Sequence, residues 1–250
     1  MKQIFVGFLV FLSSYSLNAQ HIFETDFSRT SSAEDWHGLV VDVPLEIFNN
    51  VINDIKTGRF KTYHKIPNVK PPYDYEEEEE KSWLIFYGLS QLPHKENQQG
   101  FLIQGNNHSD DMNYWIYRKF NKKKVGSLKT IEVQINISSN HARGGMGVGG
   151  RQNFDLELCL FDRDPSKNLS LDSNQHIRFP LPLKCIFIGD TAVHDEFSFN
   201  PPFKTKTMIA NDIFNYPRLK NFWIAIGFHS GFEGFSGLFY ENISLRFNGK

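Results

Sequence analysis

The most regular segment of the chain reads Thr130-Ile131-Glu132-Val133-Gln134-Ile135-Asn136-Ile137. Successive side chains of a β-strand point to opposite faces, so this period of two places every apolar residue of the segment on one face. The pattern predicts a strand with one face against a core and the other in water.

Similar runs recur along the chain, and many are rich in β-branched or aromatic residues, which favour strands. They cover residues 22–27, 38–43, 83–87, 100–104, 156–161, 183–188, 222–228 and 237–247. In the last run, Phe239, Ile243, Leu245 and Phe247 share one parity, and Glu241 interrupts it. Helix-like spacing is confined to Leu45–Ile55 and Ile209–Phe214.

Strands without regularly alternating helices disfavour a parallel α/β sheet. We therefore predict an all-β fold, an antiparallel β-sandwich of jelly-roll (galactose-binding-like) type, with Phe23–Phe27 beside Leu238–Phe247. We predict one domain over residues 20–250, with a mobile acidic insertion near 67–81 that contains the run Glu76–Glu80.

The N-terminus has the three parts of a secretory signal peptide over residues 1–19. Lys2 supplies the positive charge, Ile4–Leu12 the apolar stretch and Ala19 the small residue at the expected cleavage point. We therefore expect a secreted or periplasmic protein without a transmembrane anchor, since a spanning helix needs roughly 20 apolar residues. The near-neutral net charge of −1 argues against a nucleic-acid partner.

Cys159 and Cys185 are the two cysteines of the sequence. Export permits a disulfide between them. Each lies within a strand-like run, so a bridge requires those two strands to be neighbours, and two buried free thiols are the alternative.

The segment Gly145-Met146-Gly147-Val148-Gly149-Gly150 matches the G-x-G-x-x-G pattern of dinucleotide-binding sites. That chemistry needs a helix to begin at the glycines, whereas the residues that follow are strand-like. The glycines are better explained by a tight turn or a close approach of two backbones.

A polar loop at 105–111 offers side-chain oxygens and one imidazole, groups that bind calcium or sugar hydroxyls. The candidate ligands of a structural calcium ion are Asn106, Asn107, Asp110 and Asp111. The alternative is a turn whose Asn and Asp side chains bond their own backbone.

The segment His229-Ser230-Gly231-Phe232-Glu233-Gly234 brings histidine, serine and a carboxylate close in sequence, but it lacks a G-x-S-x-G elbow. A turn between two core strands is the simpler explanation. If the protein acts on polysaccharide as a hydrolase or lyase, the acid–base candidates are Asp110, Asp111, His229 and Glu233.

Several elements occur in a fixed order. They are Gly105-Asn106-Asn107-His108-Ser109-Asp110-Asp111, Ser139-Asn140, Gly147-Val148-Gly149-Gly150 and Ser230-Gly231-Phe232-Glu233-Gly234. Together they resemble an uncharacterised family of secreted bacterial proteins, a resemblance that spans about residues 100–247. The run Phe239-Tyr240-Glu241-Asn242-Ile243 resembles the last strand of carbohydrate-binding jelly rolls.

Export, near-neutral charge and abundant aromatic residues favour a non-catalytic module that binds a glycan or another extracellular ligand. Aromatic side chains that could stack on sugar rings are Trp36, Trp83, Tyr114 and Trp115, with core packing as the alternative for each. A polysaccharide-acting enzyme and a structural surface protein are the competing hypotheses.

Overall fold

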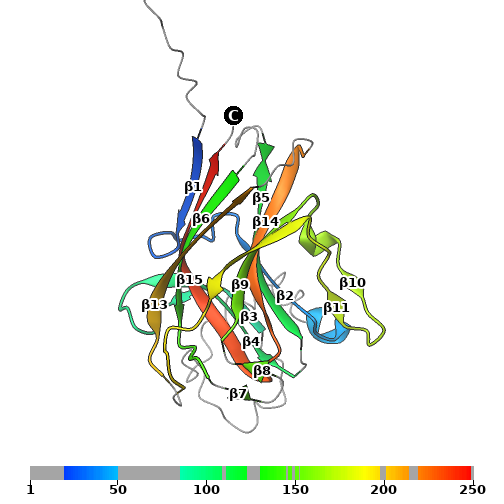
Figure 1. The fold of residues 1–250 in the computed structure, drawn as a ribbon. Coiled ribbons are helices and arrows are strands. Elements are labelled where there is room, and N and C mark those ends of the chain that lie inside the picture. The colour runs from blue at the N-terminus through cyan, green and yellow to red at the C-terminus, as the bar shows by residue number, and fades with distance from the viewer. Residues whose placement is uncertain are drawn as a thin grey trace, which may run out of the picture.

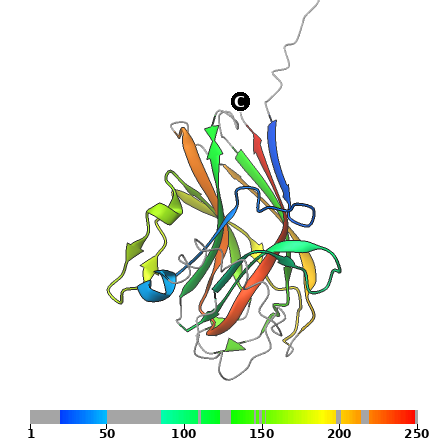
Figure 2. The same cartoon turned by 180° about the vertical axis from the view of Figure 1, so that it is seen from behind.

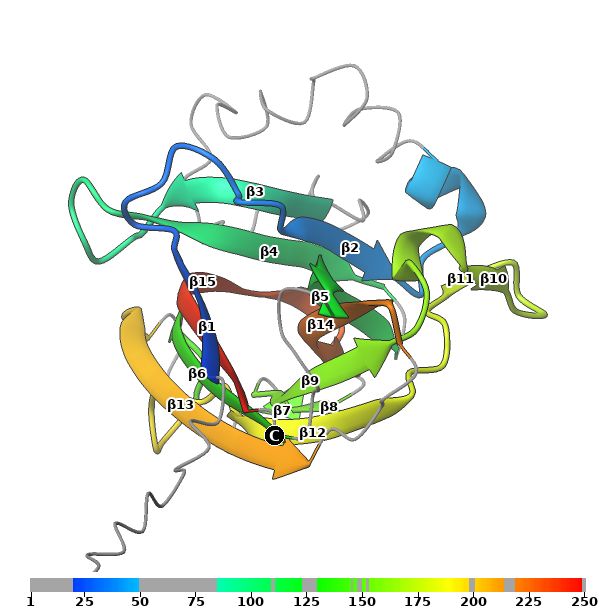
Figure 3. The same ribbon diagram turned by 90° about the horizontal axis from the view of Figure 1, so that it is seen from above.

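A computed structural model describes residues 20–49, 85–108, 111–122, 130–144, 146–147, 150–151, 153–197, 201–213 and 219–248. Within these ranges the protein consists of two antiparallel sheets packed face to face, an all-β sandwich of jelly-roll type (Figures 1 and 3). The predicted fold class is therefore confirmed. The predicted signal peptide, the predicted acidic insertion, Trp83 and Asp110 lie outside the described residues.

The larger sheet has six strands among the described residues, in the order β13-β6-β15-β4-β3, and β1 pairs with β15. Their bounds are β1 Gln20–Asp26, β3 Ile85–Gln91, β4 Gln99–Asn107, β6 Thr130–Ser139, β13 Lys204–Ile213 and β15 Gly234–Asn248. The β1–β15 pairing confirms the prediction that the first strand lies beside the last.

The smaller sheet has five described strands, in the order β12-β9-β14-β5-β2. They are β2 His37–Val41, β5 Met112–Asn121, β9 Asp155–Phe161, β12 Lys184–Asp190 and β14 Asn221–Ser230. The remaining elements are short: β7 Met146–Gly147, β8 Gly150–Arg151, the 3-10 helix η1 Pro165–Lys167, β10 Ser170–Leu171 and β11 Ile177–Arg178.

The core between the sheets follows the period of two read from the sequence. In β6, Ile131, Val133, Ile135 and Ile137 are fully buried. Each such side chain taken out of water contributes roughly 1.5–3 kcal/mol before entropy is counted. The strand predicted over residues 130–137 is thus a central strand of the larger sheet.

The interruption at Glu241 has a structural cause. The pairing of β15 with β6 shifts register between Tyr240 and Asn242, which makes Glu241 the extra residue of a β-bulge. Because a bulge reverses the alternation, Ile243 faces the core, whereas Phe239 packs with Leu102 on the outer face. The simple parity that grouped Phe239 with Ile243 is therefore corrected.

Two local predictions meet different outcomes. The helix-like run Ile209–Phe214 is wrong through Ile213, because those residues belong to β13 and leave Ile209 and Ile213 exposed. Residues 45–49 are helical, and the rest of the run to Ile55 lies outside the described residues. No helix in the described part of the chain is long and apolar enough to cross a membrane.

The glycine motif lies in a small hairpin. Met146–Gly147 pairs with Gly150–Arg151, so an antiparallel strand, and not a helix, follows the glycines. This arrangement supports the tight-turn interpretation over dinucleotide binding.

The connection from β9 to β12 covers part of the outer face of the smaller sheet. It contains η1 and the β10–β11 hairpin, which lies beside the helical turn at 45–49 (Figure 2). The hairpin is held to the chain after β2, because the Asp42 amide donates to the Ile177 carbonyl at 2.6 Å and the Ile177 amide donates to the Val43 carbonyl at 3.0 Å.

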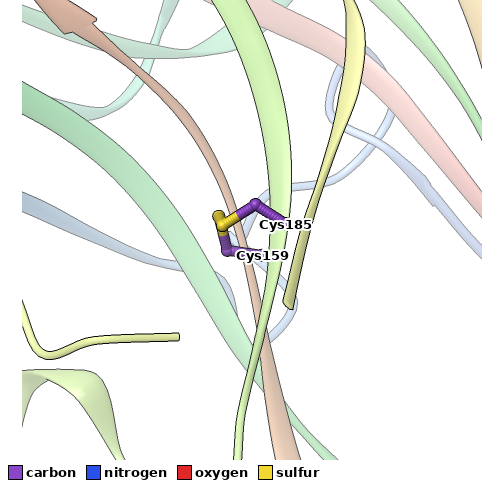
Figure 4. The surroundings of a disulfide bond; sticks show 2 residues. All are labelled: Cys159 and Cys185. Carbon is purple, nitrogen blue, oxygen red and sulfur yellow. A yellow bond between two sulfur atoms is a disulfide. The ribbon is translucent and has the colours of Figure 1, made fainter. Parts of the chain in front are cut away.

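The two cysteines form a disulfide on the same outer face. Cys159 of β9 and Cys185 of β12 are directly opposite each other in the antiparallel pair, and their sulfur atoms are bonded (Figure 4). Of the two alternatives left by the sequence, the structure shows the bridge.

Candidate functional site

Three of the aromatic residues predicted to stack on sugars lie in the interior. Trp36, Tyr114 and Trp115 are 3%, 0% and 6% exposed. Trp115 stacks on Phe179 with ring centroids 5.1 Å apart and fills the space above Gly227, where a Cβ would lie 2.6 Å from its ring. The structure corrects the prediction, because burying these large rings contributes to the fold and leaves no free face for a sugar.

Two of the predicted acid–base residues come together at one end of the smaller sheet. The His229 Nε2 atom lies 2.9 Å from Oδ1 of Asp111, and both side chains are about half exposed. Glu233 is exposed in the β14–β15 turn, and no contact joins it to this pair among the described residues. Asp110 lies outside the described part of the chain.

Arg178 connects this pair to further polar residues. Its Nη1 atom lies 3.3 Å from Asp111 Oδ2 and 2.7 Å from Asp42 Oδ2, and its Nη2 atom lies 2.6 Å from Asp172 Oδ2. His176 Nδ1 lies 3.4 Å from the second oxygen of Asp42. We call the following six residues the Arg178 network: Asp42, Asp111, Asp172, His176, Arg178 and His229.

Four separate parts of the chain position these side chains. Asp111 lies just before β5, His229 is near the end of β14, and the β10–β11 hairpin carries Asp172, His176 and Arg178. Asp42 follows β2 with a positive φ of 68°, a conformation that Asp tolerates better than most residues. The neighbouring backbone pairing between Val43 and Ile177 fixes this residue against the hairpin.

The hairpin turn organises Asp172 before it meets Arg178. The backbone amides of Asn174 and His176 donate to Asp172 Oδ1 at 2.8 and 2.9 Å. These hydrogen bonds, from His176 above all, lower the pKa of Asp172. The other oxygen is thereby left to accept from Arg178, so the guanidinium is held by a prearranged carboxylate.

The pKa values of Asp42 and Asp111 are shifted in opposite directions. Burial raises the pKa of Asp42, although the Arg178 guanidinium opposes the shift. The hydrogen bond from His229 lowers the pKa of Asp111, and Arg178 adds to that effect. At neutral pH the exposed Asp111 carboxylate therefore orients the His229 ring for hydrogen bonding.

Part of the Arg178 network also has the geometry of a metal-ligand group. One ligand atom from each of Asp42, Asp172 and His176 lies within 4.8 Å of the others, a grouping typical of cation sites. The Arg178 guanidinium bridges the two carboxylates of this group and supplies the positive charge that they require. In the structure, the cation in contact with these two carboxylates is therefore Arg178.

The predicted calcium loop divides its side chains among different partners. Asn107 donates to the carbonyls of Ser230 and Phe232, both at 2.9 Å, whereas Asp111 contacts His229 and Arg178. Asn106 lies 3.1 Å from a ring nitrogen of His108. Calcium binding by this loop stays a prediction, because Asp110 lies outside the described residues.

An exposed aromatic ring lies on the same face of the sheet. Phe187 of β12 is 59% exposed and pairs directly with Glu157 of β9, which in turn pairs with Gly227 of β14. His229 lies two residues further along β14, so its side chain points to the same face. The ring of Phe187 and the polar atoms of the Arg178 network thus belong to one surface.

Sequence reasoning found Asp111 and His229 but missed Asp42, Asp172, His176 and Arg178. A local signal existed for the hairpin, since Asp172-Ser173-Asn174 is typical of a turn in which Asp bonds its own backbone. Nothing local could show that this hairpin docks beside β2 and β5.

Comparisons with known proteins return no matching family model and no matching curated protein. Among solved structures, the mannan-recognising carbohydrate-binding module TmCBM27 has a TM-score of 0.39 at 10% identity, covering 92% of this chain and 99% of that one. A cyclase from Fischerella sp. TAU has a TM-score of 0.37 at 10% identity, with coverage of 92% and 99%.

A family 11 carbohydrate-binding module of a Clostridium thermocellum cellulase has a TM-score of 0.34 at 8% identity, covering 89% of this chain and 94% of that one. Similarities this distant carry no conclusion about a ligand. Any function must be argued from the site itself.

Proposed function

We propose that this protein is an exported, non-catalytic module that binds carbohydrate on the outer face of the smaller sheet. The observation that carries the proposal is the Asp111–His229 pair, half exposed and held by Arg178, on the same face as the exposed ring of Phe187. Oriented planar polar groups hydrogen-bond sugar hydroxyls, and an exposed ring offers an apolar surface to a sugar face.

The rigidity of the support favours recognition by a preformed surface. His229 and Phe187 lie on strands of one sheet, and β9, which lies between their strands, is covalently joined to β12 by the disulfide. A binding group held by its scaffold loses less conformational entropy when the ligand arrives. The arrangement therefore suits a ligand whose rings lie across the strands.

A glycan-array screen of the protein, expressed with its own leader and collected as secreted, tests the proposal. We expect binding to at least one glycan class, reduced about tenfold in His229→Ala and in Phe187→Ala. Ile209→Ala is the matched control, because Ile209 is equally exposed at 61% but lies on β13 of the other sheet. Silence across the array, or equal binding by all variants, would overturn the proposal.

The Asp111–His229 contact also favours a second candidate, a polysaccharide hydrolase or lyase. A histidine oriented by a carboxylate is an arrangement used in general acid–base catalysis. Incubating each bound glycan with the protein and following its chain length by mass spectrometry separates the candidates. Depolymerisation that disappears in His229→Ala would replace the binding proposal with the enzyme.

Repeating the array in EDTA tests the calcium prediction. If calcium organises the 105–111 loop, chelation lowers both glycan binding and the melting temperature, and added calcium restores them. Unchanged values in EDTA and in millimolar calcium would rule out that role.

A further inference from the structure

Two carboxylates of the proposed binding face form no ion pair within the described part of the chain. Asp155 and Glu157 lie two residues apart on β9, so both point to the outer face. Among the described residues, neither side chain makes a hydrogen bond or an ion pair. They differ in this from Asp42, Asp111 and Asp172, each of which contacts Arg178.

These two acids lie between the aromatic ring and the histidine. Glu157 is half buried and directly opposite Phe187 across the β9–β12 pair. Burial raises the pKa of Glu157, repulsion from Asp155 raises it further, and His229 acts in the opposite direction. A half-buried carboxylate beside another carboxylate is an environment that a positive charge would relieve.

Arg178 cannot supply that charge. Its guanidinium is shared among three carboxylates. Burial lowers the pKa of Arg178, but the contacts with Asp172, Asp42 and Asp111 together raise it. Asp155 and Glu157 thus add two carboxylates to a face on which the Arg178 guanidinium is already in contact with other acids. This excess of carboxylates favours a positively charged ligand.

We propose that this face selects glycans that carry free amino groups. The proposal rests on the proposed function and adds the ligand's charge class: an ammonium group lies near Asp155 and Glu157, with the sugar ring against Phe187. An ammonium beside an aromatic face and a carboxylate gains attraction from both.

The same charges disfavour two other glycan classes. A uronate or sulfated polymer would bring like charge to Asp155 and Glu157, which costs affinity and discriminates against that partner. N-acetylation of the amino sugar removes the charge while the ring remains. Comparing the affinities of the free amine and the acetamide thus isolates the electrostatic contribution to binding.

Isothermal titration of the secreted protein with glucosamine oligomers and N-acetylglucosamine oligomers of equal length tests the inference. We expect the free amine to bind about tenfold more tightly at low salt and the preference to shrink as salt is added. Glu157→Gln should remove most of the preference, while Glu24→Gln, an equally conservative change at an exposed position on β1, should leave it intact.

The possible failures are distinguishable. Equal or tighter binding of the N-acetylglucosamine oligomers would overturn the charge selection and leave the carbohydrate-binding function standing. No binding to the glucosamine oligomers would overturn the inference alone if the array shows another glycan ligand, and would overturn both if the array is silent. Binding of the amine that requires added calcium would also overturn the inference, because a metal ion, and not the ligand, would then balance the two acids. Melting temperatures of both variants confirm that they are folded.

Discussion

The outer faces of the two sheets each carry a polar network, and the two networks differ in charge balance. On the larger sheet, buried Glu241 accepts hydrogen bonds from Lys95 at 2.6 Å and from Thr205 at 2.7 Å. His94 lies 3.2 Å from Thr205 Oγ1 and 3.3 Å from Ser138 Oγ. We call these five residues the Glu241 network.

The Glu241 network has one carboxylate for one ammonium, and the other partners are neutral. Burial lowers the pKa of His94, with nearby Lys95 adding to the effect, so this ring stays neutral at physiological pH. The charge of Glu241 is paired with that of Lys95, and Ser138 is fully buried. In the Arg178 network three carboxylates share one guanidinium, and Asp111 and His229 are half exposed. The comparison teaches that the Glu241 network, with its charges paired and largely buried, serves the fold, whereas the Arg178 network leaves Asp111 and His229 within reach of a ligand.

The largest expected effect concerns the disulfide, which constrains the smaller sheet alone. The Cys159→Ala/Cys185→Ala protein loses the closure of a loop with a sequence separation of 26, and its free energy of unfolding should fall by about 3–4 kcal/mol. Denaturant unfolding of both proteins measures the difference.

Removing the disulfide should also lower glycan affinity, because Glu157 lies two residues from Cys159 on β9 and Phe187 lies two residues from Cys185 on β12. A loss under about 1 kcal/mol with full affinity would show that the smaller sheet needs no covalent support.

The second-largest effect is expected in the Glu241 network, where a substitution should lower stability and leave glycan affinity unchanged. Glu241→Gln leaves Lys95 without its carboxylate, and the free energy of unfolding should fall by about 2 kcal/mol, less than for a fully buried pair because Lys95 is 30% exposed. Glycan affinity should stay unchanged. Thermal melting and titration with the best array ligand provide both values. Lost affinity in a protein of unchanged stability would place the binding face on the larger sheet.

The sequence predicted most of the strands, because the alternation of apolar and polar residues is a local pattern. Ile131 and its apolar neighbours in β6 identify a strand from their spacing alone. The bulge at Glu241 was visible only as an interruption, since whether an acid in a strand faces solvent or meets Lys95 depends on a distant segment. A short apolar run such as Ile209–Ile213 fits a helix and a strand equally well, and pairing with β6 decides between them.

The site was predicted only in part for the same physical reason. His229 directly follows the strand predicted over residues 222–228, and Asp111 ends the polar loop that the sequence identified at 105–111. Arg178 and Asp42 join them through the docking of a hairpin, which depends on tertiary contacts. The aromatic prediction failed at Trp115 because ring size indicates both core packing and sugar stacking, and Gly227 makes room for the buried position.

The smallest effect tests whether Asp111 belongs to a charge network at all. Its pKa is lowered in the folded protein by the hydrogen bond from His229, so the carboxylate stabilises the fold above its unfolded pKa of about 3.8. This contribution is lost as the pH falls through the folded pKa. Wild type should therefore lose slightly more stability than Asp111→Asn between pH 5 and pH 2.

Denaturant unfolding at several pH values within that window measures the difference, and Glu24→Gln serves as the control because it changes an exposed acid on the other sheet. Half exposure of Asp111 keeps the effect small, since solvent screens the contact with His229. Equal losses in wild type and Asp111→Asn would mean that His229 is not held by this carboxylate in solution. The proposed binding face would then lack the oriented His229 ring on which it depends.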